Sequence, residues 1–224
     1  MINNFKLGMK MFRYGSGLVG MIVCSCIFLV LGLLINFSYY VLGVEGGPGD
    51  VLFMVVGMYP VQVLYSLSVS NYIAASPVKK RMQTSVTATI ACFNMLIIYL
   101  ICSLLKVIKL AGHPENIGVV CTEMVSLAGF SVIILLSLAL AYKYFWTSIL
   151  LGVVVYFYAT MTLNGVNGIW PEIFGNSVST YVLVLLLGLA AVVIGGFGQY
   201  GLSLLVYKAP MSKYAQSAAV RKEM

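Results

Sequence analysis

The chain has 224 residues, of which 61% are hydrophobic and only 8% charged, and its formal net charge is +7. A soluble domain carries about 25% charged residues, so a surface this poor in charge is not compatible with water on all sides. The composition therefore predicts an integral membrane protein. The positive charge needs no nucleic-acid partner, because basic loops are attracted to the anionic headgroups of membrane lipid.

Residues 1–17 have an amphipathic pattern. Four apolar residues share one helical face, namely Ile2, Phe5, Met9 and Phe12. The neighbouring face carries the bases Lys6, Lys10 and Arg13. This pattern is typical of a helix lying in the membrane interface, with its bases among the headgroups. A disordered start is the alternative.

Six apolar runs reach the roughly 20 residues that a helix needs to cross the hydrocarbon. They cover 18–42, 51–72, 84–105, 122–142, 146–164 and 180–207. The runs are continuously apolar and lack the alternation of barrel strands, which favours helices. The predicted fold is an all-α membrane protein with one six-helix domain over 18–207 and a tail over 208–224. The first run is too long for the core of a signal peptide and lacks a cleavage site, so we expect it to remain as a span.

The positions of the bases predict the orientation. Of the 13 lysines and arginines, all but Lys106 and Lys109 fall on one side of the predicted spans. The excess of bases on cytoplasmic loops places that side, with both termini, in the cytoplasm. Lys106 and Lys109 would extend from the outer end of the third span toward the headgroups. Four acids fall in the predicted outer loops: Glu45, Asp50, Glu115 and Glu172. The expected location is the plasma membrane, in a bacterium.

Residues for chemistry are scarce. His113 and Asp50 are the only histidine and aspartate, and both are predicted in outer loops. The chain has no HExxH, no GxSxG and no intramembrane aspartate pair, so neither a catalytic nor a metal site is expected. Glu123 is the one ionisable residue within a predicted span, near its outer end where interfacial water reaches. A structural role and a role in ion coupling both stay open for it.

Neutral polar residues recur along three predicted spans. Gln62, Ser66 and Ser70 repeat every four residues, as do Tyr156, Thr160 and Asn164. Such stripes line a polar pathway or hydrogen-bond one helix to the next. The candidate pathway residues are Tyr59, Gln62, Ser66, Asn94, Tyr156 and Thr160.

Two segments between spans have special character. SNYIAASPVKKRMQ, between the second and third spans, places Ser76 as a cap before a helix that starts at Pro77, with bases directly after it. NGVNGIWPEIFGNSVS, before the sixth span, is too apolar for an exposed loop and predicts an interfacial or re-entrant piece. Within the sixth span, GGFGQYG allows close helix packing or a bend.

This layout resembles the permease of a type-2 ATP-binding-cassette (ABC) exporter. The features that carry the resemblance are a basic interfacial helix, six spans, a buried outer segment before the sixth, and the stretch Ala75-Ser76-Pro77-Val78-Lys79-Lys80-Arg81, which looks like the small–Ser–Pro–x–basic segment of that family. The resemblance covers nearly the whole chain in topology and only these few residues in sequence.

The resemblance implies a partner ATPase and a second permease chain, identical or homologous. The implied coupling segment comprises Asn71, Tyr72, Ser76, Pro77, Val78, Lys79, Lys80 and Arg81. The implied outer gate contains Trp170, Pro171, Glu172 and Phe174. The chain has no GxxxxGK[ST], so ATP and Mg²⁺ would bind to the partner and no cofactor is expected on this chain. A non-transporting scaffold or accessory subunit and an ion-coupled carrier using Glu123 are the alternatives.

Overall fold

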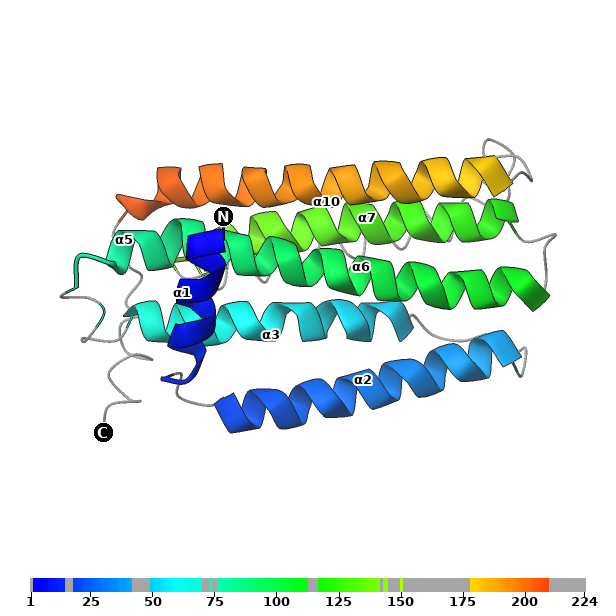
Figure 1. The fold of residues 1–224 in the computed structure, drawn as a ribbon, viewed down its shortest axis with the longest axis horizontal. Helices are drawn as coiled ribbons and strands as arrows, with labels where there is room; N and C mark the ends of the chain where they lie inside the picture. Colours follow the sequence, from blue (N-terminus) through cyan, green and yellow to red (C-terminus); the bar gives the residue numbers. More distant parts are fainter. Residues whose placement is uncertain are drawn as a thin grey trace.

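The computed structural model of the protein describes residues 2–14, 18–41, 49–69, 73, 76–112, 117–141, 143–144, 150 and 178–209. Across these residues the fold is all-helical. The helices are α1 (Ile2–Phe12), α2 (Leu18–Val41), α3 (Gly49–Val69), α5 (Lys79–Arg81), the π-helical turn η1 (Met82–Val86), α6 (Thr87–Gly112), α7 (Ile117–Ala141) and α10 (Val178–Tyr207). Figure 1 shows the long helices side by side, with α1 crossing them.

Four of the described helices are long and apolar enough to cross a membrane: Leu18–Ser38, Lys79–Ala111, Ile117–Ala141 and Val178–Tyr207. They coincide with the predicted first, third, fourth and sixth spans and indicate a membrane protein. The predicted second span is helical as α3, where Leu52–Tyr65 forms a shorter apolar stretch. The predicted fifth span, 146–164, lies outside the described residues, apart from Leu150.

Contacts between helices define the two ends of the bundle. Lys143, just after α7, donates to the backbone carbonyl of Tyr207, where α10 ends. Near the other end of the bundle, Tyr181 at the start of α10 donates to the carbonyl of Ser103 in the second half of α6, at 2.9 Å. The C-terminal ends of α3, α7 and α10 therefore lie at the same end of the bundle as α1 and α5. We call it the basic end, because all the described lysines and arginines except Lys106 and Lys109 belong to it.

Glycines let α10 pack closely against its neighbours. A methyl group built on Gly188 would lie 1.8 Å from the Tyr99 hydroxyl of α6, and one on Gly196 would lie 2.5 Å from the Cys92 sulfur. Gly195 packs against Val132 of α7 in the same way. Because α10 continues as a single helix through these glycines, they serve close packing. Of the two readings of GGFGQYG, packing is the one observed.

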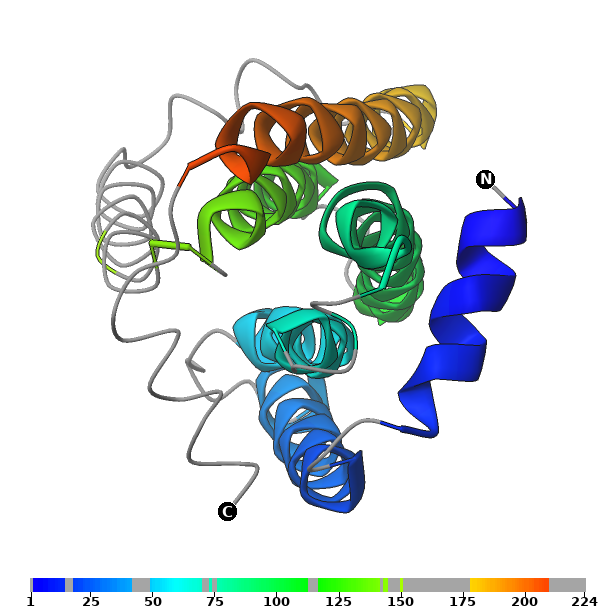
Figure 2. The same cartoon turned by 90° about the vertical axis from the view of Figure 1, so that its left-hand side faces the viewer.

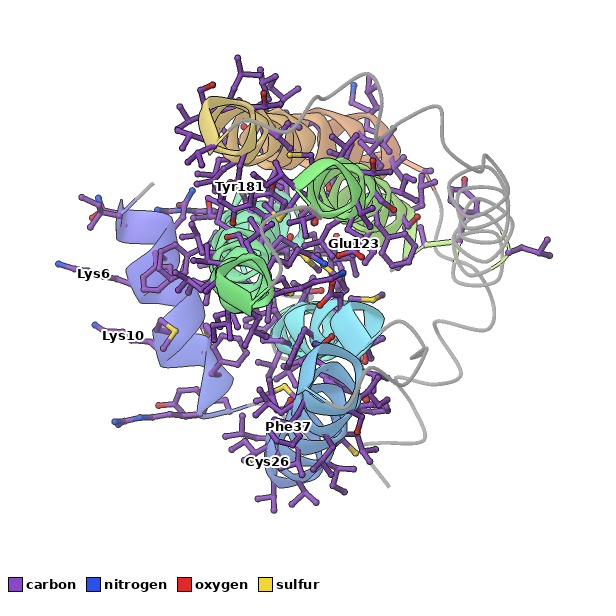
Figure 3. The ribbon with its side chains drawn as sticks, turned by 90° about the vertical axis from the view of Figure 1, so that its right-hand side faces the viewer. Lys6, Lys10, Cys26, Phe37, Glu123 and Tyr181 are labelled. Atoms are coloured by element: carbon purple, nitrogen blue, oxygen red, sulfur yellow. The ribbon has the colours of Figure 1, made fainter. Side chains whose placement is uncertain are left out.

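The crossing helix α1 packs on the bundle through its apolar face. The Phe5 ring meets the Phe93 ring of α6 edge-on, with centroids 4.9 Å apart. Gly8 is buried against Ile90. Lys6 and Lys10 point away from the bundle (Figure 3). The predicted amphipathic helix is therefore present, and its two faces separate as the sequence pattern indicates.

Candidate functional site

Residues 76–81, here called the elbow, turn the chain from the end of α3 into the long helix that continues as α6. The Ser76 hydroxyl accepts a hydrogen bond from the Val78 backbone N–H at 3.2 Å, and the Ser76 carbonyl accepts one from the Lys79 N–H at 3.1 Å. Ser76 thus closes a turn, but the predicted cap is wrong, because the regular helix starts at Lys79 and not at Pro77 and its N-cap residue is Val78. The Ser76 side chain hydrogen-bonds to the nearby backbone in place of a helical hydrogen bond, and so it forms this turn before the helix.

The inner side of the elbow is fixed by an apolar cluster. Val78 packs on buried residues of α3, η1 and α6 and on Ile73 of the connection after α3; the residues of the helices are Leu64, Met82, Val86 and Ile90. Residues of α1 cover the same cluster, namely Phe5, Leu7, Met11 and Phe12. A buried core of this kind resists deformation because interiors are close-packed. The elbow, α1 and the start of α6 therefore form one stiff unit.

The outer side of the elbow is polar and open. Pro77, Lys80 and Arg81 are exposed. The Arg81 Nε donates to the Asn4 side-chain oxygen of α1 at 2.8 Å, and the Lys80 ammonium lies 5.9 Å from the centre of the Tyr207 ring. These contacts join the elbow to α1 and to the end of α10 while leaving its bases accessible.

Lys143 ties the ends of α7 and α10 together. Its ammonium donates to the backbone carbonyls of Tyr207 and Ala209 and lies 5.6 Å from the Tyr207 ring centre. Burial lowers the pKa of Lys143, and the charge of Lys79 lowers it further. The ends of α7 and α10 and the elbow thus converge on the Tyr207 ring. A movement of the elbow would be passed to both helices.

The predicted pathway residues do not form one continuous lining in the described residues. Tyr59 faces α2, with its ring 6.1 Å from the Phe28 ring, whereas Gln62 is exposed on α3. Asn94 is half-buried on α6, and its amide nitrogen has no hydrogen-bond partner among the described residues. The side chain of Ser66 and all of Tyr156 and Thr160 lie outside the described residues.

A different polar cluster lies between α3, α6 and α10. The buried Tyr65 hydroxyl faces the side chains of Thr87, Gln199 and Ser203. Tyr65 is not among the pathway residues that the sequence predicts, and Gln199 belongs to the glycine-rich segment GGFGQYG. Their helices meet through tertiary packing, and no spacing within one helix predicts that meeting.

The coupling residues Asn71 and Tyr72 lie outside the described residues, as does the predicted outer gate. That gate comprises Trp170, Pro171, Glu172 and Phe174. The placement of these residues stays a prediction.

At the opposite end of the bundle, three partly exposed charged side chains form a network around the buried Lys106. The Lys106 ammonium lies 2.8 Å from an Asp50 carboxylate oxygen and 2.6 Å from Glu123 Oε2. The Lys109 ammonium lies 2.9 Å from Glu123 Oε1. Asp50, Lys106, Lys109 and Glu123 are here called the charge network. Two bases and two acids make it neutral, and Lys106 is only 1% exposed.

The charge network corrects three expectations. Lys106 does not extend toward headgroups, because it is buried between α3 and α7. Asp50 is not a loop residue but stands in the first turn of α3, where the helix dipole also favours a negative charge. Glu123 is six residues inside α7, which begins at Ile117, and both of its oxygens accept from lysines. Desolvated charges require such pairing, since an unpaired one costs several kcal/mol.

Polar neighbours complete the network and join further helices to it. Asn36 of α2 donates to Asp50 at 3.2 Å. Figure 3 shows Glu123 inside the bundle, with Tyr181 of α10 nearby. The sequence signal for this site is that the two outer-side lysines, Lys106 and Lys109, lie near span ends that also carry Asp50 and Glu123. Among the described residues, no three His, Cys, Asp or Glu side chains lie close enough together to hold a metal ion.

Comparisons with known proteins return nothing: no family model, curated protein or solved structure matches this chain.

Proposed function

We propose that this chain is the membrane-spanning subunit of an ATP-driven exporter of the type-2 ABC class, which pairs with a second permease chain and with separate ATPase subunits. The observation that carries the proposal is the elbow. It presents exposed bases on one side and is fixed to α1, α3 and α6 on the other. Such a construction suits a segment that takes up force from a soluble motor and passes it to spanning helices.

The charges at the basic end support a cytoplasmic position for the elbow. The exposed bases at this end come from α1, from the elbow and from the end of α10, where Lys208 follows Tyr207. The two described carboxylates, Asp50 and Glu123, belong to the charge network at the other end. By the bias of cytoplasmic loops toward Lys and Arg, the basic end faces the cytoplasm, and α1 lies in the inner interface.

The course of α7 and α10 supports the predicted fifth crossing. The two helices pack in parallel, since Val132 and Leu135 lie against Gly195 while Lys143 reaches Tyr207. Ala141 and Val178 are therefore at opposite ends of the bundle (Figure 1). A connection between parallel neighbours must return along the bundle, and a span within 146–164 would supply that return.

The substrate proposed is a peptide or another amphipathic compound, which leaves the cell or the inner leaflet. The proposed location is the plasma membrane of a bacterium. The buried cluster around Tyr65 is the polar interior that such a pathway would use at the basic end. The charge network suits ion coupling poorly, because both oxygens of Glu123 are already engaged by lysines.

The test asks first whether an ABC ATPase is encoded beside this chain, and then reconstitutes the chain with that ATPase. The purified complex in lipid nanodiscs should show ATPase activity that changes with substrate. Pro77→Gly should abolish most of the substrate response while both subunits stay assembled, because the flexible residue loosens the turn that Ser76 and Pro77 set. Ala111→Gly is the matched control, since Ala111 is exposed at the opposite end of α6 and should leave the response unchanged.

The outcomes separate the candidate functions. An assembled complex whose ATPase ignores both substrate and Pro77→Gly would instead indicate a scaffold or accessory subunit. Substrate uptake without any ATPase, lost in Glu123→Gln, would indicate an ion-coupled carrier.

A further inference from the structure

A cavity of about 200 Å³ opens between α1, α6 and α10 at the basic end. Its lining residues come from η1, from the start of α6, from the second half of α10 and from α1, and they are Asn4, Ser85, Ala88, Thr89, Cys92, Val193, Gly196, Phe197 and Tyr200. Figure 2 looks along the bundle from this end and shows α1 standing beside α6. The proposed pathway and the elbow's motor contact do not use this cavity.

The shape and chemistry of the cavity follow from its floor and its mouth. Ala88, Cys92 and Gly196 are buried and apolar or small, and they form the closed floor of the cavity, where Gly196 packs directly on Cys92. Phe197 and Tyr200 are exposed at its mouth. From Ser85 to Cys92 the cavity follows α6 for about 10 Å, given a rise of about 1.5 Å per residue. When the mouth of such an apolar space faces lipid, an acyl chain is the ligand that fits it.

A cationic group stands at one end of this apolar space. Arg81 precedes Ser85 by one helical turn and binds Asn4, which lines the cavity. Only its Nε is used in that bond, so its terminal nitrogens keep their donors. Neither described carboxylate lies near it, because Asp50 and Glu123 are both in the charge network. A guanidinium so placed matches a phosphate, with two parallel hydrogen bonds.

We propose that this cavity binds one anionic phospholipid of the inner leaflet. The phosphate lies at Arg81 and Asn4, and part of one acyl chain lies in the cavity beside Thr89, Val193 and Phe197. The lipid packs on α1, α6 and α10 together and so holds α1 on the bundle. The inference goes beyond the exporter proposal, since it requires only that the basic end lies in a membrane interface.

The test is lipid binding to the delipidated protein, without any ATPase. Detergent-purified protein is titrated with phosphatidylglycerol and with phosphatidylcholine, and the bound lipids are counted by native mass spectrometry. One phosphatidylglycerol should bind more tightly than any phosphatidylcholine. Thr89→Trp, which fills the cavity, and Arg81→Gln, which removes the guanidinium, should each weaken that binding about tenfold, which corresponds to about 1.4 kcal/mol.

Matched variants serve as controls. Leu104→Trp adds the same ring to an exposed position of α6 outside the cavity, and Lys10→Gln removes a base that points away from the bundle. Both should bind the lipid as the unchanged protein does. Should Thr89→Trp not fold, Ser85→Trp fills the same space.

Three results would overturn the proposal. Unchanged binding in the filled-cavity variant would mean that lipid attaches only to the basic surface. Equal affinity for phosphatidylcholine, or unchanged phosphatidylglycerol binding in Arg81→Gln, would show that the site does not recognise an anionic headgroup. Displacement of the lipid by inorganic phosphate at equal concentration would identify free phosphate as the ligand.

Discussion

The two ends of the bundle hold their charges in opposite ways. At the end with the charge network, two lysines and two carboxylates are paired with one another around the buried Lys106 and leave no net charge. At the basic end, Lys80 and Arg81 are exposed, and the described residues there include no carboxylate to balance them. Paired buried charges position helices, whereas unbalanced exposed charges are available to lipid or to another protein. The comparison therefore assigns a structural role to the end with the charge network and an interaction role to the basic end.

The largest expected effect comes from breaking the charge network. Glu123→Gln removes the carboxylate that both Lys106 and Lys109 contact, and it leaves Lys106 with Asp50 alone. Removing one partner of a fully buried ion pair costs about 3–5 kcal/mol, and the loss here should fall below that range because the Glu123 side chain is 29% exposed. Thermal unfolding in detergent, followed by size-exclusion chromatography, should show a strongly lowered midpoint.

The control for this change restores neutrality. In Glu123→Gln combined with Lys109→Gln, the remaining Lys106–Asp50 pair is balanced, so part of the lost stability should return. If Glu123→Gln alone unfolds at the midpoint of the unchanged protein, the network is not structural and the comparison of the two ends fails.

A smaller effect is expected from the packing of α10. Gly188→Ala would place a methyl group 1.8 Å from the Tyr99 hydroxyl, so the helices must shift apart. Overpacking of this kind costs about 1–3 kcal/mol. Gly201→Ala in the same helix meets nothing within 4 Å and should be neutral or stabilising. Equal unfolding midpoints for both variants would contradict the close packing described for α10.

The smallest effect on stability is expected at the elbow. Replacing Lys80 and Arg81 together by Gln removes exposed charges whose contacts with Tyr207 and Asn4 lie at the surface. Such substitutions usually change stability by less than about 0.5 kcal/mol. The unfolding midpoint should stay the same while the response to the ATPase is lost. A large drop in the midpoint would assign the elbow bases to architecture instead.

Much of the fold follows from local pattern. The long apolar runs predict α2, α6, α7 and α10, and the spacing of Phe5, Met9 and Phe12 predicts α1, because both signals depend on neighbours within one helix. The Ser76 turn is likewise a local signal. The helices of the predicted third and fourth spans continue beyond their apolar cores, and this is why Lys106 and Glu123 were assigned to the membrane surface.

The charge network escaped the sequence because its partners are far apart in the chain. Lys106 of α6 is paired with Asp50 of α3, and the two residues are far apart in the sequence. The meeting of Tyr65 with Gln199 depends in the same way on how α3 packs beside α10. Neither the ranges nor the charges of single spans specify which helices are neighbours, so these sites required the tertiary structure.

The most direct test of the account asks which side of the membrane the elbow occupies and what covers it. Lys80→Cys, in a background without the five native cysteines, is treated with a membrane-impermeant maleimide. We predict no labelling in intact cells, labelling in inside-out vesicles, and protection in those vesicles when the ATPase is bound. Labelling of this cysteine from outside intact cells would contradict the account.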